Sequence, residues 1–218
     1  MIHDILNWFG STAFTLFGKD TSWTEVFGFV TGGFAVWYSA KVSVWNFPWG
    51  LINALFFFAL FIDAKLYADA WLQVGFFVLL LIGWVAWLKG GPQRTELNVR
   101  VASWQHLALV AVFIAGFTVF FRPILESHDD PYPTLDALTT GMSLGAQYLL
   151  SLKYIQNWAI WIAADLIYIP LYFAKDLVLT SIIYVVFLCM CIMGVREWLE
   201  TRRTQNVIAT QATVAAEA

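Results

Sequence analysis

Two apolar segments of this sequence each carry an indole and an amide or carboxyl group four residues apart. In the first segment these are Trp49 and Asn53, and in the second they are Trp161 and Asp165. Residues four apart lie on one face of an α-helix, so each segment presents a flat aromatic ring beside a polar group. Polar groups at membrane depth are costly and usually functional. The pattern predicts a site for a small ring-bearing solute in the middle of a bilayer.

One turn earlier, the two helix faces carry Trp45 and Asn157, and Gln147 and Gln73 are two further amides that could line the pathway. Indole faces stack on heteroaromatic rings, most strongly on cationic ones. Amides and carboxylates form hydrogen bonds with sugar hydroxyls or a carboxamide. The expected solute is therefore a flat heteroaromatic ring joined to a polyol. The candidate substrate-binding residues are Trp45, Trp49, Asn53, Gln73, Gln147, Asn157, Trp161 and Asp165.

Each main candidate also has an ordinary structural interpretation. Trp45 fits the aromatic belt at a membrane interface, and Trp49 and Trp161 fit plain helix packing. Asn53 could join two helices through its amide. Asp165 could be a capped or protonated core carboxyl, although it is the one acid well inside an apolar segment.

The composition is that of a polytopic membrane protein. The chain is 60% hydrophobic and 12% charged, with a mean hydropathy of +0.69, whereas soluble domains carry about 25% charged residues. The net charge of −3 gives no indication of a nucleic-acid partner. The histidines and cysteines lack metal-ligand spacing, and we expect neither a metal nor a cofactor. We expect no His, Cys or Ser to lie beside a base partner, and no second acid lies at helical spacing from Asp165, which argues against a membrane enzyme.

Hydropathy predicts seven membrane-spanning helices near the short end of the ~20 residues that a helical crossing needs. The predicted spans are Thr24–Ala40, Trp45–Phe61, Leu72–Leu88, Trp104–Phe121, Leu135–Ser151, Asn157–Ala174 and Leu177–Val195. The residues Ile5–Phe17 are apolar but interrupted, and we expect an interfacial helix there. The polar, Ala-rich end at Thr204–Ala218 is expected to be disordered.

An internal repeat relates the first three spans to the last three. At an offset of 112 residues, five identities recur without a gap: Gly33, Ser39, Lys41, Trp49 and Phe61 pair with Gly145, Ser151, Lys153, Trp161 and Phe173. The motif Gly83-x-x-x-Trp87 recurs as Gly194-x-x-x-Trp198 at an offset of 111. Because a single helix lies between the repeats, both run in the same direction, as in transporters with parallel repeats.

The predicted fold is an all-α polytopic membrane protein in which seven transmembrane helices form two parallel three-helix repeats joined by a linker helix (3+1+3). Residues 1–23 form an interfacial N-terminal segment, 24–88 repeat 1, 89–134 the loops and linker helix, 135–199 repeat 2, and 200–218 a cytoplasmic tail. Eight Lys and Arg residues fall on one side of the seven spans and four on the other. This asymmetry predicts a cytoplasmic C-terminus and an external N-terminus.

These residues resemble those of the PnuC-type vitamin transporters, which carry nicotinamide riboside. The resemblance covers the chain from about Thr24 to Trp198. Its specific parts are Phe47-Pro48-Trp49-Gly50 with Asn53, Asp63-x-Lys65-Leu66-Tyr67-Ala68-Asp69 with Gln73, and Gln156-Asn157-Trp158-x-x-Trp161-x-x-x-Asp165 followed by Tyr168-Ile169-Pro170-Leu171-Tyr172.

The resemblance implies a fold akin to the SWEET sugar transporters, a homotrimer in a bacterial inner membrane, and facilitated diffusion without a coupled ion. It also implies that a cytoplasmic ribosylnicotinamide kinase drives uptake by phosphorylating the riboside. Two alternatives stay open. The solute could be thiamine or another nucleoside-like vitamin, or the protein could be a membrane scaffold in which the polar residues join helices.

Overall fold

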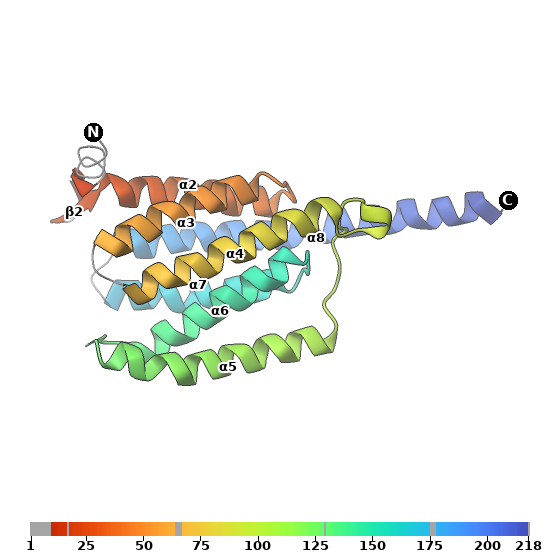
Figure 1. The fold of residues 1–218 in the computed structure, drawn as a ribbon. Helices are drawn as coiled ribbons and strands as arrows, with labels where there is room; N and C mark the ends of the chain where they lie inside the picture. The colour runs from red at the N-terminus through yellow and green to blue at the C-terminus, as the bar shows by residue number, and fades with distance from the viewer. Residues whose placement is uncertain (1–9, 17, 64–66, 129, 175–177, 218) are drawn as a thin grey trace.

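The computed structural model describes residues 10–16, 18–63, 67–128, 130–174 and 178–217 of the 218-residue chain. These residues form a β-hairpin followed by a bundle of long helices (Figure 1). The elements are β1 (Thr12–Leu16), β2 (Lys19–Ser22), α2 (Trp23–Ala40), α3 (Asn46–Asp63), α4 (Tyr67–Lys89), the 3-10 turn η1 (Pro92–Arg94), α5 (Trp104–Glu126), α6 (Pro133–Ser151), α7 (Asn157–Ala174) and α8 (Val178–Glu217). Within these described residues, the helices α2 to α8 coincide with the seven predicted spans to within a few residues at most ends, and the predicted helical fold is confirmed.

The N-terminal segment differs from the expectation of an apolar helix over Ile5–Phe17. Residues 12–16 form β1, which pairs antiparallel with β2. The Thr-Ala-Phe-Thr-Leu sequence of this strand is rich in residues that favour strands over helices, and Gly18 with φ of 77° makes the turn. The helix prediction is therefore wrong for these five residues. Gly10 is helical and Ser11 lies in a bend, and residues 5–9 and 17 lie outside the described residues.

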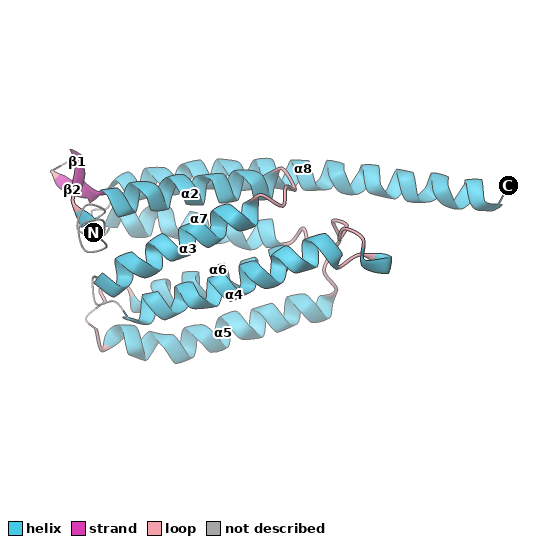
Figure 2. Cartoon of the chain, turned by 45° about the horizontal axis from the view of Figure 1, so that its top comes forward, coloured by secondary structure: helices cyan, strands magenta, loops and turns pink. Residues whose placement is uncertain are grey.

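Four helices, α4, α5, α7 and α8, are individually long and apolar enough to cross a membrane, and Asn46–Ala59 of α3 is a shorter apolar stretch. Helix α6 is more polar than these helices, and it packs against α4, α5 and α7. Ten of its residues are buried, and these include the polar residues Thr139, Ser143, Gln147 and Ser151, whose side chains therefore face protein rather than lipid. All seven helices run side by side (Figures 1 and 2).

Helix α8 is the largest departure from the predicted organisation. It continues as one helix for 40 residues, through the tail that we expected to be disordered, up to Glu217. Figure 1 shows this end projecting beyond the bundle, at the end opposite the β-hairpin. Ala, Gln, Glu and Arg are good helix formers, and extending an existing helix needs no new nucleus.

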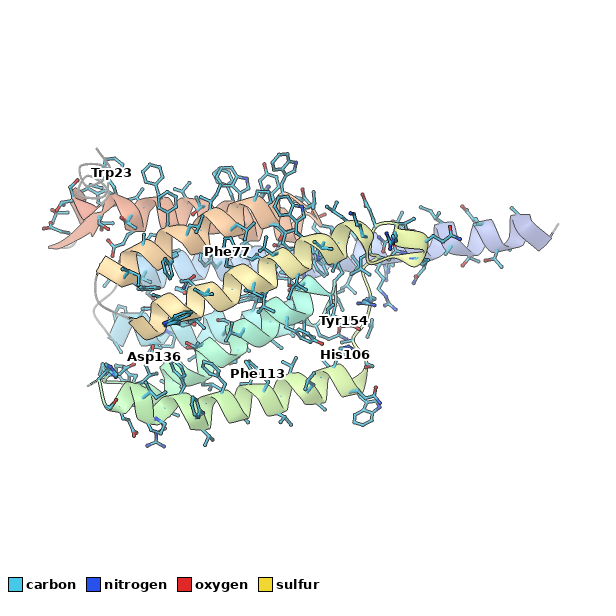
Figure 3. All side chains as sticks on the ribbon, viewed as in Figure 1. Trp23, Phe77, His106, Phe113, Asp136 and Tyr154 are labelled. Carbon is cyan, nitrogen blue, oxygen red and sulfur yellow. The ribbon has the colours of Figure 1, made fainter. Side chains whose placement is uncertain are left out.

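The linker that precedes α5 is bound to the turn between α6 and α7. The Arg100 amide donates to the Lys153 carbonyl at 3.0 Å, and the Ile155 amide donates to the Arg100 carbonyl at 3.0 Å. The Arg100 guanidinium lies 4.5 Å from the Tyr154 ring centroid, and Tyr154 packs against His106 at 4.9 Å (Figure 3). This strap ties the linker to the second repeat.

The two repeats share a local turn geometry that fixes their register. Val42 and Lys153 both adopt left-handed backbone conformations, with φ of 55° and 53°. Four residues further on, Asn46 and Asn157 each donate through Nδ2 to the carbonyl three residues earlier, at 2.7 and 2.8 Å. Both pairs are 111 residues apart, so the uninterrupted alignment at 112 is wrong by one residue.

Candidate substrate-binding site

The one-residue shift changes which side chains are equivalent in the middle of the bundle. In the register of 111, Trp161 corresponds to Gly50 and Asp165 corresponds to Ala54. Neither corresponds to the indole or the amide of the first segment, so the expected duplication of the site is wrong. The arrangement of the helices has pseudo-twofold symmetry, whereas the side chains at the centre of the bundle differ between the two repeats. An unsymmetrical solute needs such a centre.

The candidates Trp161 and Asp165 lie on one stripe of α7 together with three further aromatic residues. From the N-terminal to the C-terminal end of the helix, the stripe consists of Trp158, Trp161, Asp165, Tyr168 and Tyr172, at spacings of three and four residues. This spacing keeps successive side chains on one face of a helix. Aromatic rings thus lie both above and below a single carboxyl group.

Asp165 is buried at 3% exposure. The Cys191 thiol of α8 donates to its Oδ2 at 3.5 Å. The corresponding residues of the first repeat are Ala54 and Leu80, which are both buried and apolar. The polar pair is therefore a feature of the second repeat alone.

Three tyrosines lie beyond Asp165, toward the C-terminal end of α7, and contact one another. The ring centroids of Tyr168 and Tyr184 are 4.6 Å apart, those of Tyr172 and Tyr184 are 5.1 Å apart, and those of Tyr168 and Tyr172 are 5.5 Å apart. Ring faces attract cations, particularly where water is excluded. The cluster and the neighbouring carboxyl group together favour a flat, positively charged ring.

The facing helix, α6, contributes amide and hydroxyl groups. Ser143 and Gln147 are one turn apart, and the Ser143 hydroxyl lies 3.4 Å from that of Tyr168. Gln147 is 8% exposed. In the described part of the chain, three buried side-chain polar atoms lack a hydrogen-bond partner: Gln147 Nε2, Asn157 Oδ1 and Trp158 Nε1. All three belong to α6 or α7, and unpartnered buried donors and acceptors are unusual in folded proteins.

The two asparagine candidates have structural partners. The Asn157 amide shapes the start of α7, as Asn46 does for α3. Asn53 donates from Nδ2 to the Gly28 carbonyl at 2.6 Å and to the Thr31 hydroxyl at 3.3 Å. These bonds join α3 to α2, which is the interhelical interpretation that the sequence left open.

The remaining candidates lie apart from the α7 stripe. Trp45 is 60% exposed, as expected of a belt aromatic. Trp49 packs against Phe34 of α2 with ring centroids 4.7 Å apart. Gln73 is half-buried on α4, and in the register of 111 it corresponds to Tyr184 of the tyrosine cluster. The structure thus places Gln147, Trp161 and Asp165 within the second repeat, where Asn157 shapes the start of α7, and the other candidates belong to the first repeat.

Sequence reasoning missed Ser143, Tyr184 and Cys191 as members of this site, and it did not include Trp158, Tyr168 or Tyr172 among the candidate residues. The alternating spacing of three and four along α7 would have indicated Trp158, Tyr168 and Tyr172. The side chains of α6 and α8 carry no such signal, because their contribution depends on helix packing. An apolar groove on α5, between Val112 and Pro123, is lined by that helix alone and has none of these polar groups.

Three comparisons place this architecture among known proteins. The sequence matches the family model described as "Nicotinamide mononucleotide transporter" over residues 22–200. The nicotinamide riboside transporter PnuC of Escherichia coli (strain K12) is 28% identical over 217 residues, covering 87% of this chain and 90% of that protein. The riboflavin/roseoflavin transporter RibM of Streptomyces davaonensis is 27% identical over 210 residues, covering 93% and 97%. A crystal structure of the vitamin B3 transporter PnuC shares the fold, with a TM-score of 0.65 at 24% identity over 84% of this chain and 83% of that one.

Proposed function

This chain belongs to the nicotinamide mononucleotide transporter family, and from that premise we propose that it carries nicotinamide riboside across a bacterial inner membrane. The observation that carries the proposal is the buried carboxyl group of Asp165 between aromatic side chains on one stripe of α7. Nicotinamide riboside contains a pyridinium ring with a permanent positive charge. A carboxylate and ring faces are the groups that recognise such a cation in a water-poor site.

Each part of the solute has a counterpart among the buried and half-buried residues of the site. Trp161 and the tyrosine cluster offer faces for the pyridinium ring, and Asp165 offsets its charge. The Nε2 atom of Gln147, which has no hydrogen-bond partner among the residues that the structure describes, can donate to a ribose hydroxyl or to the carboxamide oxygen. Gln73 would act further out, on the opposite repeat.

A neutral ring is the second candidate, because a relative is named as a riboflavin/roseoflavin transporter. Riboflavin also joins a flat heteroaromatic system to a polyol, and it would use the same stacking surfaces and amides. It would leave Asp165 without a cation to neutralise. The presence of this carboxyl group favours the charged riboside, and thiamine, another cationic vitamin, is a test ligand for the same reason.

We propose that transport is facilitated diffusion, with the riboside trapped by a ribosylnicotinamide kinase in the cytoplasm. The three connections at residues 41–45, 90–103 and 152–156 lie at one end of the bundle (Figure 1). That end carries the larger number of basic residues and is therefore assigned to the cytoplasm. The C-terminus would then be cytoplasmic and the N-terminus external, and we expect a homotrimer.

Calorimetric titration of the purified protein in detergent tests this function. Nicotinamide riboside, thiamine and riboflavin are titrated separately into the wild type, Trp161→Ala and Asp165→Asn. The matched control is Trp104→Ala, because this indole is 75% exposed at the start of α5. Size-exclusion profiles establish that each variant is folded.

Binding of nicotinamide riboside that Trp161→Ala and Asp165→Asn abolish, and that Trp104→Ala leaves unchanged, supports both the solute and the site. Binding of riboflavin in place of the riboside would replace the proposed solute. No binding of any of the three by a well-folded wild type would favour the scaffold hypothesis.

A further inference from the structure

Four aromatic side chains form a continuous chain between the two repeats. Phe47 and Trp87 meet edge to face with centroids 5.1 Å apart, Trp87 and Trp198 meet at 5.8 Å, and Trp198 and Trp158 meet at 5.6 Å. The four side chains are at most 2% exposed. Water therefore reaches none of them in this structure.

This chain of rings follows the pseudo-twofold symmetry of the bundle. In the register of 111, Phe47 corresponds to Trp158 and Trp87 corresponds to Trp198. The two outer contacts both have an interplanar angle of 90°. The symmetry axis thus passes between Trp87 and Trp198, at the boundary where the repeats meet.

The two central indoles each hold the opposite repeat. Trp87 of α4 donates from Nε1 to the Leu150 carbonyl of α6 at 3.0 Å. Trp198 of α8 donates from Nε1 to the Ser39 carbonyl of α2 at 2.8 Å. A buried hydrogen bond of this kind is costly to break without a replacement partner, so each indole pins the inner end of the other repeat's first helix.

Glycines allow the outer rings to come this close. A Cβ atom on Gly194 would lie 2.6 Å from Cζ2 of Trp158, and one on Gly83 would lie 2.7 Å from Cε1 of Phe47. The motif Gly-x-x-x-Trp, which recurs in the sequence, is thereby explained. Its glycine makes room for one ring, and its tryptophan supplies the next.

The chain of rings lies at the end of the bundle that carries most of the basic residues. Phe47 and Trp158 are the second residues of α3 and α7, and Trp87 lies two residues before the end of α4. Asp165 is two turns deeper than Trp158 on α7, and Cys191 is two turns deeper than Trp198 on α8. The rings therefore separate the buried polar site from the cytoplasmic end.

We propose that Phe47, Trp87, Trp158 and Trp198 form the inner gate of the transporter, and that it opens on the Trp198 side. A solute leaving for the cytoplasm has to pass between the repeats, and these rings close that boundary. The proposal concerns the path and does not depend on which solute is carried.

The asymmetry of the gate follows from the contacts around its two central indoles. The Lys153 ammonium lies 4.4 Å from the Trp87 ring centroid and donates to the Leu97 carbonyl at 2.7 Å. The Leu97 amide in turn donates to the Trp87 carbonyl at 3.0 Å. Lys153 on the ring and Leu97 on the backbone carbonyl thus hold Trp87 from a second side. Near Trp198, the preceding residue Glu197 forms an ion pair with Lys41. The side chains of Lys41 and Glu197 are 40% and 35% exposed, and exposed ion pairs contribute little to stability.

Cys191 provides a native reporter for the gate. It is one of two cysteines in the chain, is buried behind the rings and shares a helix face with Trp198. Cys189 is exposed on the helix surface, so Cys189→Ala is the background for all variants. The measurement is the rate at which a membrane-impermeant trimethylammonium methanethiosulfonate modifies Cys191, in inside-out and in right-side-out membrane vesicles.

Trp198→Phe keeps a ring but loses the indole N–H, and it should speed modification about fivefold in inside-out vesicles only. Trp198→Ala should give a larger increase. Trp87→Phe should give a smaller increase than Trp198→Phe, because the contacts of residue 87 with Lys153 and Leu97 remain. Trp104→Phe, the same change at an exposed indole on the same side, should leave the rate unchanged.

Unchanged inner rates in both Trp198 variants would overturn the gate. An equal increase in both vesicle orientations would also overturn it, because that result means that the rings merely pack the bundle. An equal or larger effect of Trp87→Phe would refute the assigned direction of opening. Trp198→Phe keeps most of the buried volume, so the test stands even where Trp198→Ala does not fold.

Discussion

The thiol of Cys191 donates a hydrogen bond to the carboxylate of Asp165 over 3.5 Å. The equivalent residues of the first repeat, Leu80 and Ala54, meet in the same buried core cluster without any polar atom in their side chains. A thiol is a weak donor and does little to stabilise a buried negative charge. A carboxylate in this position therefore gains most from a cationic solute.

The first prediction follows from this poor compensation. Asp165→Asn keeps the size and one acceptor oxygen but removes the charge. We expect affinity for nicotinamide riboside to fall about ten- to a hundredfold, because two opposite charges about 6 Å apart attract by about 3 kcal/mol at an effective dielectric constant of about 20. Affinity for the neutral, reduced riboside should fall by about threefold or less. Calorimetry with the two ligands measures both values, and equal losses would remove the charge argument.

The second prediction concerns the close contact at Gly194. Gly194→Ala places a Cβ 2.6 Å from the Trp158 ring, and the resulting overpacking should lower the free energy of unfolding by about 1–3 kcal/mol. Gly33→Ala is the matched control, because its Cβ would meet nothing within 4 Å. That change should be neutral or stabilising, as alanine favours helices. Thermal unfolding in detergent measures both, and an equally stable Gly194→Ala protein would contradict the packing described here.

Much of the fold was predictable because its signal is local. A run of about 20 apolar residues is sufficient to identify a spanning helix, and the seven predicted segments are all helical. The predicted family resemblance and the transporter class are confirmed by the family match. The tail was mispredicted because composition was taken as evidence of disorder, whereas a helix that leaves the bundle continues without a new nucleus.

The register of the repeat was less predictable from sequence. The identities at an offset of 112 include Trp49 with Trp161. Apolar segments are rich in the same few residue types, so a sequence alignment shifted by one residue contains nearly as many similar pairs. The Gly-x-x-x-Trp motif recurs at 111, and the turn geometry at Val42 and Lys153 shows that this offset also holds for the middle of the repeat. One residue corresponds to 100° around a helix, which is enough to place Asn53 against α2 while Asp165 contacts α8.

The third prediction separates structural from solute-binding asparagines. Asn157→Ala removes the Nδ2 donor that shapes the start of α7, and Asn46→Ala removes its counterpart on α3. Each should reduce the free energy of unfolding by about 1 kcal/mol, with similar small effects on affinity. A selective loss of affinity in Asn157→Ala would instead assign its unpartnered Oδ1 to the solute. Thermal unfolding and calorimetry on the two variants distinguish these outcomes.

The fourth prediction concerns Lys153, which lies in the turn between α6 and α7 and is buried at 5% exposure. Burial lowers the pKa of its ammonium group, and the Glu96 carboxylate partly opposes this shift. Between the lowered pKa of the folded state and the ordinary value of 10.5, the unfolded chain binds a proton that the folded protein does not. Stability should therefore rise with pH through that window, and below it the cost of burying the charge is fully present.

Lys153→Met keeps the aliphatic length over Trp87 and removes the charge, so this contribution to the pH dependence should vanish. The measurement is the unfolding temperature in detergent at several pH values up to 10.5, taken as the difference between the variant and the wild type. The matched control is Lys41→Met, because Lys41 is largely solvated. A difference curve for Lys153→Met that is flat across the whole range would mean that the ammonium is compensated by the Leu97 carbonyl and the Trp87 ring. A curve that falls toward alkaline pH, with the variant more stable than the wild type at the acid end, is the expected result, since the wild type alone regains stability as Lys153 loses its proton.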